Sequence, residues 1–270
     1  MSATESFQLT ENDRQHIAED GFLVREGVFS AAECEQMAAD CDALAEKLLK
    51  EKEAERMQFG NYLIERRDDV GTIVKWEPGG DLLQGIEPFV HLSNALNEWS
   101  QDPRLIEACK GFLGEGNVTL FTEKINFKRA HKGDKYILHQ DYPYWVNLAK
   151  DPGRVVTAMI YLDDSSIENG CLQVAPGSHK DGLAPCWEGE IGRDREIDTN
   201  KFDENRLIPL EVKKGTVAFF GSLLVHRSAP NTSNKDRRAL LYSYQPAGFP
   251  HALEVRRQML AQQKSDEEFA

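Results

Sequence analysis

Two observations predict a mainly β protein with helical additions. From Asn117 onward, short apolar or alternating runs recur between Gly, Pro, Asn, Asp and Ser residues, as in an antiparallel sandwich or barrel. Before that point, helix-start signals predominate and one long stretch is amphipathic. We therefore expect a single domain over residues 1–270, in which residues 1–115 form a mainly helical support and residues 116–250 form the β core.

Start and stop signals locate the first elements. Thr10 can cap a short helix that Asp20-Gly21 ends, and the apolar residues 22–24 then suggest a short strand. Ser30 followed three residues later by Glu33 is a capping box, in which each residue satisfies a backbone donor of the other. This box predicts the start of a long, charged, amphipathic helix.

The rest of the chain divides into a turn-rich segment, a second helical stretch and the strands. The long helix is expected to reach about Met57, and Phe59 to Pro88 is rich in turn residues. A helical stretch over residues 93–113 is interrupted near Asp102-Pro103. The polar tail after His251 is expected to be a helix or a frayed end. The expected strands lie at 118–127, 136–138, 155–162, 172–174, 207–212, 216–220 and 240–244.

Composition and charge restrict the class of protein. Hydrophobic residues make up 40% and charged residues 29%, which is ordinary for a globular chain. The formal net charge of −13 argues against a nucleic-acid or anionic-membrane partner, because phosphate binding needs an electropositive surface. No stretch approaches the roughly 18 consecutive apolar residues of a membrane span. The polar N-terminal sequence has no apolar leader core, so we expect a cytoplasmic protein.

The five cysteines form an odd, scattered set without a CxxC pair. A disulfide framework or a zinc ribbon is therefore not expected. Cys34 and Cys41 are seven residues apart on the long helix, which puts them on one face. We interpret them as buried structural thiols rather than as a redox pair, because reactive cysteines need an electropositive setting.

The sharpest local feature is His139-Gln140-Asp141, directly after the apolar run at 136–138. On an extended backbone, residues two apart point to the same side, so an imidazole and a carboxylate are presented together as two ligands of one metal. Such a tripeptide also occurs by chance as a surface or capping pair. A third candidate, His226, follows a predicted strand and the apolar step at 223–225.

Two histidines and one carboxylate that leave three coordination positions open are typical of non-haem iron(II) oxygenases. Eleven residues after His226 comes Arg237, beyond a turn-rich stretch. If the chain reverses there, Arg237 begins a strand beside His226, and its planar guanidinium can bind a distal carboxylate bidentately. The alternative is that Arg237 and Arg238 form a solvated strand end.

Four stretches of this sequence resemble the phytanoyl-CoA dioxygenase family of Fe(II)- and 2-oxoglutarate-dependent oxygenases. They are DGFLVREGVFSAAECEQM near the N-terminus, HQD at 139–141, GCLQVAPGSHK at 170–180, and HRSAPNTSNKDRRALLYSY at 226–244. The resemblance implies a double-stranded β-helix, or jelly-roll, core of the cupin-like kind. It also implies three cofactors or cosubstrates, which are Fe(II), 2-oxoglutarate and dioxygen.

Position by position, the resemblance assigns roles to individual residues. His139, Asp141 and His226 match the catalytic iron ligands of the family. Arg237 matches the arginine that binds the far carboxylate of 2-oxoglutarate, and Ser228 matches its hydroxyl partner. The same resemblance assigns cosubstrate binding to two further residues, Asn126 and Tyr136.

The resemblance also bears on the reaction. Halogenating relatives replace the carboxylate ligand with a small residue, so Asp141 favours hydroxylation, with release of succinate and CO2. Desaturation, epoxidation or ring closure on the same scaffold remains an alternative, as does a β-sandwich that binds a metal or ligand without catalysis. A zinc hydrolase is disfavoured, because the sequence has no HExxH-like helix. Arg227 stands where the family often has Gly, and its side chain would narrow or charge the pocket entrance.

The substrate is expected to be a small molecule, and both an anionic and an uncharged one are compatible with the sequence. Tyr142, Tyr144 and Trp145 follow the HQD motif and either line a partly apolar pocket or pack in the core. Gln173 is a further candidate substrate contact. The basic run from Lys124 to Lys135 would attract an anion such as a carboxylate or a CoA ester, but we favour a solvated loop there. The sequence does not indicate the oligomeric state.

Overall fold

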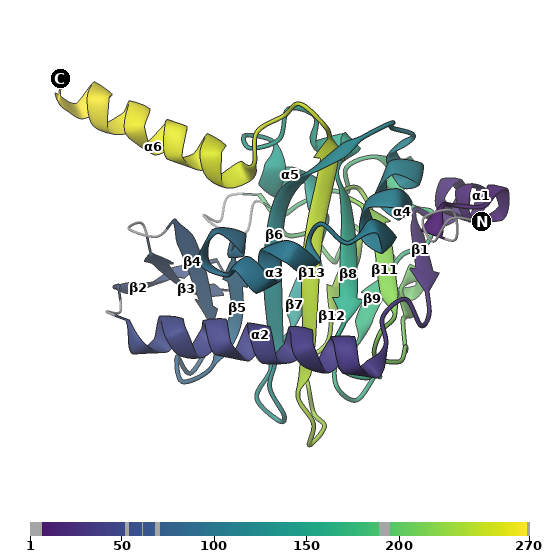
Figure 1. The fold of residues 1–270 in the computed structure, drawn as a ribbon, viewed down its shortest axis with the longest axis horizontal. Coiled ribbons are helices and arrows are strands. Elements are labelled where there is room, and N and C mark those ends of the chain that lie inside the picture. Colours follow the sequence, from purple (N-terminus) through teal and green to yellow (C-terminus); the bar gives the residue numbers. More distant parts are fainter. Residues whose placement is uncertain (1–6, 52–53, 61, 68–70, 189–194, 269–270) are drawn as a thin grey trace.

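The structure, a computed structural model, describes residues 7–51, 54–60, 62–67, 71–188 and 195–268, and side chains up to residue 262. Two antiparallel sheets face each other, and helices cover the outer face of the larger one (Figure 1). This arrangement confirms the expected mainly β fold with helical additions. Within the described part of the chain, no helix is long and apolar enough to cross a bilayer.

The larger sheet has nine strands in the order β1-β11-β8-β13-β6-β5-β4-β3-β2. Its central strands β8, β13 and β6 are long and pair over most of their length, with Tyr242 opposite both Glu123 and Ala158. The strands are β1 (Phe22–Arg25), β11 (Val217–Gly221), β8 (Val156–Tyr161), β13 (Arg237–Pro246), β6 (Val118–Lys128), β5 (Leu83–Glu87), β4 (Thr72–Trp76), β3 (Tyr62–Arg67) and β2 (Arg56–Phe59).

The smaller sheet has four strands in the order β10-β9-β12-β7. They are β10 (Ile208–Pro209), β9 (Leu172–Val174), β12 (His226–Ser228) and β7 (Tyr136–His139). In the β12–β7 pair, His226 lies opposite His139 and Ser228 lies opposite Tyr136. Strands from distant parts of the sequence therefore present polar side chains at neighbouring positions.

The helices begin where the capping residues predict. Ser30 forms the expected capping box with Glu33. Thr10 caps the first helix as expected and also forms a capping box, with Asp13. Gly21 ends the first helix in the left-handed conformation. The α-helices are α1 (Glu11–Asp20), α2 (Ala31–Lys50), α3 (Asn94–Trp99), α4 (Pro103–Leu113), α5 (Tyr142–Trp145) and α6 (Ala252–Glu268), with 3-10 turns η2 (Val90–Leu92), η3 (Pro152–Arg154), η4 (Ser178–Asp181) and η5 (Glu204–Arg206).

Alternating side chains on the larger sheet form two cores. On β8, Val156, Ala158 and Ile160 pack outward against α2 and its neighbours, whereas Met159 and Tyr161 point between the two sheets. Helix α2 crosses the strands on the outer side (Figure 1). The outward core is the larger, so the helices anchor the sheet while its inner face remains available for a site.

Two expectations about the N-terminal half are wrong. Residues 59–88 are not mainly turns, because β2 to β5 extend the larger sheet through that segment. The alternating burial of β4, from Thr72 to Trp76, is that of a strand with one buried face. Helix α2 ends at Lys50 rather than near Met57, which leaves the residues from Arg56 free to form β2.

The cysteine interpretation agrees with the structure. Cys34 and Cys41 on α2 are both fully buried, and burial raises the pKa of each thiol above its ordinary value. Such thiols are poor nucleophiles, because only the thiolate is reactive. None of the five cysteines, all of which lie within the described residues, forms a disulfide bond.

Candidate metal centre and cosubstrate site

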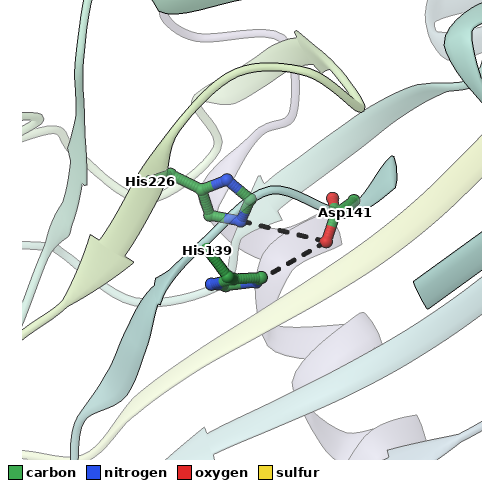
Figure 2. Close-up of side chains that lie close together, drawn as sticks. All are labelled: His139, Asp141 and His226. Atoms are coloured by element: carbon green, nitrogen blue, oxygen red, sulfur yellow. Dashed lines mark ion pairs between the residues drawn. The ribbon is translucent and has the colours of Figure 1, made fainter. Parts of the chain in front are cut away.

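The side chains of His139 on β7, His226 on β12 and Asp141 directly before α5 lie close together (Figure 2). The Nε2 atoms of His139 and His226 lie 3.6 and 4.0 Å from the same oxygen, Oδ1 of Asp141. The two imidazole centroids are 4.2 Å apart. The potential ligand atoms of all three residues lie within 4.8 Å of one another, close enough for a single metal ion to bind them all. The structure thus brings together all three predicted metal ligands.

Backbone carbonyls orient both histidines. Nδ1 of His139 lies 2.7 Å from the carbonyl oxygen of Ile137, and Nδ1 of His226 lies 2.9 Å from that of Leu224. A carbonyl only accepts hydrogen bonds, so each Nδ1 carries the proton and each Nε2 keeps its lone pair. Both lone pairs then point toward Asp141 (Figure 2). Outer contacts of this kind fix the tautomer and the ring orientation of metal-binding histidines.

Electrostatics keep Asp141 and His226 in the protonation states that a metal requires. Burial, and next the neighbouring His139, lower the pKa of His226 to about 4, so its imidazole is neutral at pH 7. Burial alone would raise the pKa of Asp141, but the hydrogen bond from His139 and the adjacent His226 hold that pKa below its ordinary value. An anionic carboxylate and a neutral imidazole result, as metal binding requires.

A cavity of about 500 Å³ opens beside the triad, between the inner faces of the sheets. It is large enough for a cosubstrate and a small organic molecule together. Its lining contains most of the side chains that the sequence indicated, namely His139, Asp141, His226, Arg237, Ser228, Asn126, Tyr136 and Trp145.

Arg237 lies at the inner end of β13 and is only 2% exposed. Its Nη2 donates to the carbonyl of Gly170 at 2.9 Å, and its Nε donates more weakly to that of Asn169 at 3.4 Å. Its Nη1 is buried and has no hydrogen-bond partner among the described residues. A buried guanidinium donor without a partner is costly, and a carboxylate in the cavity would satisfy it.

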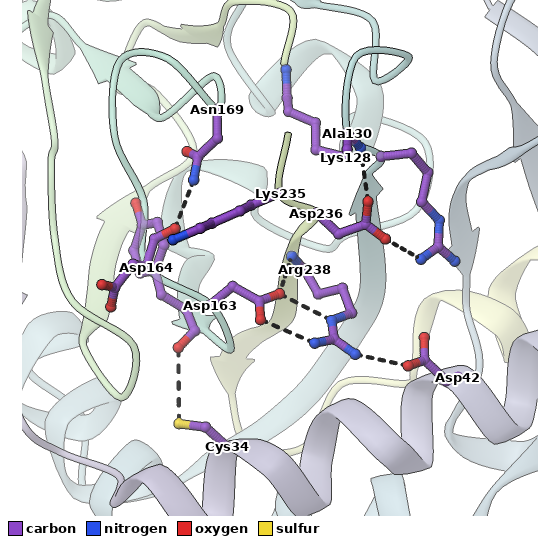
Figure 3. Close-up of polar contacts among 12 residues, drawn as sticks. Cys34, Asp42, Lys128, Ala130, Asp163, Asp164, Asn169, Lys235, Asp236 and Arg238 are labelled. Atoms are coloured by element: carbon purple, nitrogen blue, oxygen red, sulfur yellow. Dashed lines mark hydrogen bonds and ion pairs between the residues drawn. The ribbon is translucent and has the colours of Figure 1, made fainter. Parts of the chain in front are cut away.

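Arg238, the next residue, points to the opposite side of the sheet. It is held by Asp163 through two hydrogen bonds of 2.9 and 3.0 Å and by Asp42 of α2 at 2.7 Å (Figure 3). Successive residues of a strand face opposite sides, which separates the roles of the two arginines. The alternative of a solvated pair is therefore wrong for Arg237.

The remaining predicted cosubstrate residues surround Arg237. Ser228 and Tyr136 are paired across β12 and β7, and both are buried. The hydroxyl of Tyr136 lies 2.9 Å from Oδ1 of Asn126 and 3.1 Å from the carbonyl oxygen of Gln84. These contacts fix the phenol ring as one wall of the cavity.

This site fits Fe(II) and 2-oxoglutarate. Two imidazoles and one carboxylate are donors that suit iron(II), and the arrangement leaves coordination positions open toward the cavity. The unpartnered Nη1 of Arg237 supplies the position for a distal carboxylate in the same cavity. The donor set and the orphaned guanidinium are thus independent indications of the same two groups.

The three predicted substrate contacts are placed differently from one another. Trp145 lines the cavity, together with Tyr144, whereas Tyr142 and Gln173 are not among its lining residues within the described part of the chain. Gln173 instead accepts a hydrogen bond of 2.8 Å from Nε of Arg227. Arg227 itself lines the cavity and forms an ion pair with Glu204.

The basic run is not a single solvated loop, contrary to our preferred interpretation. Lys124 and Lys128 lie on β6 and face inward, and Lys128 is only 1% exposed. His131, Lys132 and Lys135 are exposed. The alternation of Lys124, Asn126 and Lys128 on one strand face was the signal that could have separated the two groups.

Further cationic residues that the sequence did not indicate line the cavity, among them Lys75 on β4 and Arg256 on α6. Neither belongs to a motif. Their position depends on how β4 and α6 pack against the rest of the chain, so no local pattern could have indicated them.

Comparisons with known proteins agree with this geometry. The family model for phytanoyl-CoA dioxygenase (PhyH) matches residues 17–239. The phytanoyl-CoA dioxygenase domain-containing protein 1 of Bos taurus is 27% identical over 262 residues, which cover 87% of this chain and 89% of that protein. An ectoine dioxygenase of Bordetella parapertussis is also 27% identical, over 87% of this chain and 75% of its own length.

Solved structures show the same fold. EctD from S. alaskensis, with 2-oxoglutarate and 5-hydroxyectoine, superposes with a TM-score of 0.67 at 20% identity, over 88% of this chain and 76% of that one. The carbocyclase SnoK from nogalamycin biosynthesis, described as non-heme and alpha-ketoglutarate-dependent, superposes with a TM-score of 0.63 at 19% identity, over 90% and 86% of the two chains. The core is thus the double-stranded β-helix that the resemblance implied. Because the family model spans most of its length, this chain belongs to the phytanoyl-CoA dioxygenase family of iron- and 2-oxoglutarate-dependent dioxygenases.

Proposed function

We propose that this protein hydroxylates a small organic molecule, with Fe(II) held by His139, Asp141 and His226 and with 2-oxoglutarate held by Arg237. The observation that carries the proposal is that the triad and the unpartnered Nη1 of Arg237 line one cavity. A module that only binds ligands needs neither open metal positions nor a buried carboxylate clamp.

Each of these residues has a defined task. His139 and His226 offer Nε2 while Ile137 and Leu224 hold their Nδ1 protons, so the ligand atoms are oriented before the metal arrives. Arg237 binds the distal carboxylate, with Ser228, Asn126 and Tyr136 beside it. The bound iron and cosubstrate supply the oxidising chemistry, with release of succinate and CO2.

The protein also excludes water from the reacting groups. The triad side chains are at most about one fifth exposed, since the exposures of His139, Asp141 and His226 are 14%, 19% and 8%. The ring of Tyr144 packs edge-on against that of His139, with 5.8 Å between their centroids, and the ring centroids of Phe220 and His226 are 5.1 Å apart. Such a shell limits side reactions of an oxidising site.

Hydroxylation is supported by the carboxylate of Asp141, which occupies the position that a halide would need. The structural relatives include a carbocyclase and the epimerase SnoN, so other oxidative outcomes occur on this fold. Mass analysis of the product separates them, because hydroxylation adds one oxygen atom to the substrate whereas desaturation removes two hydrogens.

An anaerobic titration tests the proposal. Protein with Fe(II) should develop the weak visible metal-to-ligand absorption on addition of 2-oxoglutarate. Asp141→Ala and His226→Ala should abolish it, because each removes one of the three ligands. His131→Asn is the matched control, since His131 lies exposed in a loop. The assignment would be contradicted if Asp141→Ala developed the absorption at wild-type intensity, or if the wild-type protein did not develop it.

A further inference from the structure

The entrance of the cavity has an apolar rim. Met57 and Phe59 of β2 and Met259 of α6 line it, with exposures of 49%, 42% and 43%. Large apolar side chains that stay exposed around a cavity mark a binding surface, because a folded chain gains nothing by leaving them in water. The rim therefore fits a ligand with an apolar body.

Inside this rim, three cations surround one carboxylate. Nζ of Lys75 lies 3.2 Å and Nζ of Lys124 lies 3.8 Å from the two oxygens of Glu87. Arg256 of α6 lines the same cavity. Burial would raise the pKa of Glu87, but Lys75, Lys124 and Arg256 together lower it to about 2. All four residues line the cavity. The cluster thus carries an excess of positive charge in a chain whose net charge is −13.

The cluster has an unused donor. Nη1 of Arg256 is buried and has no hydrogen-bond partner among the residues that the structure describes. Glu87 offers one negative charge to Lys75, Lys124 and Arg256, and Lys75 and Lys124 are mostly buried, with exposures of 15% and 22%. Burial, and next the neighbouring Lys75, lower the pKa of Lys124 to about 7, so a further anion would be needed to keep all three side chains charged. Buried cations need a counter-charge, and the open cavity is where one would bind.

Lys124 connects this cluster to the metal centre. Its Nζ lies 4.5 Å from the ring centroid of Tyr136, the residue that forms the wall next to Asn126. It is also close enough to Asp141 for the two charges to interact. At least one cation of the cluster, Lys124, therefore lies beside the wall of the metal and cosubstrate site.

We propose that the substrate is an amphiphilic anion whose carboxylate or phosphate group is bound by Arg256, Lys75 and Lys124, with its apolar body against Met57, Phe59 and Met259. This inference rests on the proposed function, because it names the substrate class of the same cavity. The charged end lies inward and the apolar end lies at the entrance. Arg256 and Met259 contribute from one face of α6, so this helix completes the site.

Calorimetric titration of matched probes tests the charge requirement. Octanoate and octyl phosphate are added to anaerobic protein saturated with Fe(II) and 2-oxoglutarate, and octanamide serves as the uncharged counterpart of octanoate. We expect an anion to bind at least about tenfold more tightly than the amide, equivalent to about 1.4 kcal/mol. The two anions distinguish a carboxylate site from a phosphate site. If neither octanoate nor octyl phosphate binds more tightly than octanamide, the proposal is overturned.

Variants on one helix test the location. Arg256→Gln should weaken binding of the preferred anion by about tenfold and leave octanamide binding unchanged, because it removes a charged donor without removing apolar surface. Arg257→Gln is the matched control on the same helix, since Arg257 is exposed and does not line the cavity. Lys124→Met keeps the length of the side chain and removes its charge, and it should also reduce the affinity for the anion.

The outcomes separate this inference from the proposed function. Equal effects of Arg256→Gln and Arg257→Gln overturn the anion site while the iron–2-oxoglutarate absorption of the wild-type protein still stands. Absence of that absorption removes the proposed function, whatever the preference between octanoate and octanamide.

Discussion

Replacing Arg237 with lysine tests whether this residue binds the cosubstrate through its geometry or only through its charge. The ammonium group of lysine preserves the positive charge but cannot bond to Gly170 and also present a donor where Nη1 lies. One charge-assisted hydrogen bond to a buried carboxylate contributes about 1.5 to 3 kcal/mol. We therefore expect the affinity for 2-oxoglutarate to fall roughly 10- to 150-fold in Arg237→Lys.

The assay is the anaerobic titration of Fe(II)-loaded protein with 2-oxoglutarate, followed by the visible absorption. Affinity for Fe(II), measured by competition with a chelator, should be unchanged because Arg237 is not a ligand. Arg238→Lys is the control of equal chemistry on the opposite face of β13, where Asp163 and Asp42 bind the side chain (Figure 3). An unchanged 2-oxoglutarate affinity in Arg237→Lys, or an equal loss in Arg238→Lys, would refute the reasoning.

Two further changes probe the supports of the site and of the fold. Gly170→Ala should weaken 2-oxoglutarate binding in the same titration. Gly170 has a φ of +73°, and an added Cβ would clash with the carbonyl oxygen of Ala229, so the carbonyl of residue 170 that accepts from Arg237 would be displaced. Gly114→Ala controls for backbone strain alone, because Gly114 also has a positive φ but its added Cβ would meet nothing within 4 Å. Glu33→Gln should lower stability in urea unfolding at pH 7, because the hydrogen bond from Arg104, opposed by partial burial and supported by Ser30, lowers the pKa of Glu33 to about 2. That contribution is present above the ordinary pKa of 4.5 and is lost as pH falls toward 2, so the stability difference from the wild-type protein should shrink below pH 4.5 and a constant difference would contradict it.

The sequence was sufficient for features that depend on local chemistry. The capping residues Thr10 and Ser30 mark helix starts wherever the chain folds. His139 and Asp141 lie close together as their spacing predicts, although β7 ends at His139 and Asp141 has an α-helical backbone conformation rather than an extended one. His226 was predictable as a partner only because a third ligand was needed. Its pairing opposite His139 is a property of the sheet register.

Features that depend on packing were not predictable. Strands β2 to β5 were hidden because the turn residues between them dominate the segment, although β4 alternates between buried and half-buried residues. The inward position of Lys124 contradicts the usual exposure of lysine, and only the pairing of β6 with β13 and β5 fixes which face it occupies. Arg256 reaches the cavity through the position of α6, which no motif encodes.

The direct opposition of His139 and His226 on β7 and β12 makes a bound ion a cross-link between hydrogen-bonded neighbours in the sheet. Metal loading should therefore slow amide hydrogen exchange most in these two short strands. Without the ion, local unfolding of such short strands exposes little buried surface and therefore costs little free energy. The long central strands β8 and β13, anchored by the helices on their outer side, should exchange at the same rate with or without the ion. The fraction of protein with metal bound could then be measured from the amide exchange rates of the smaller sheet, without an assay of catalytic turnover.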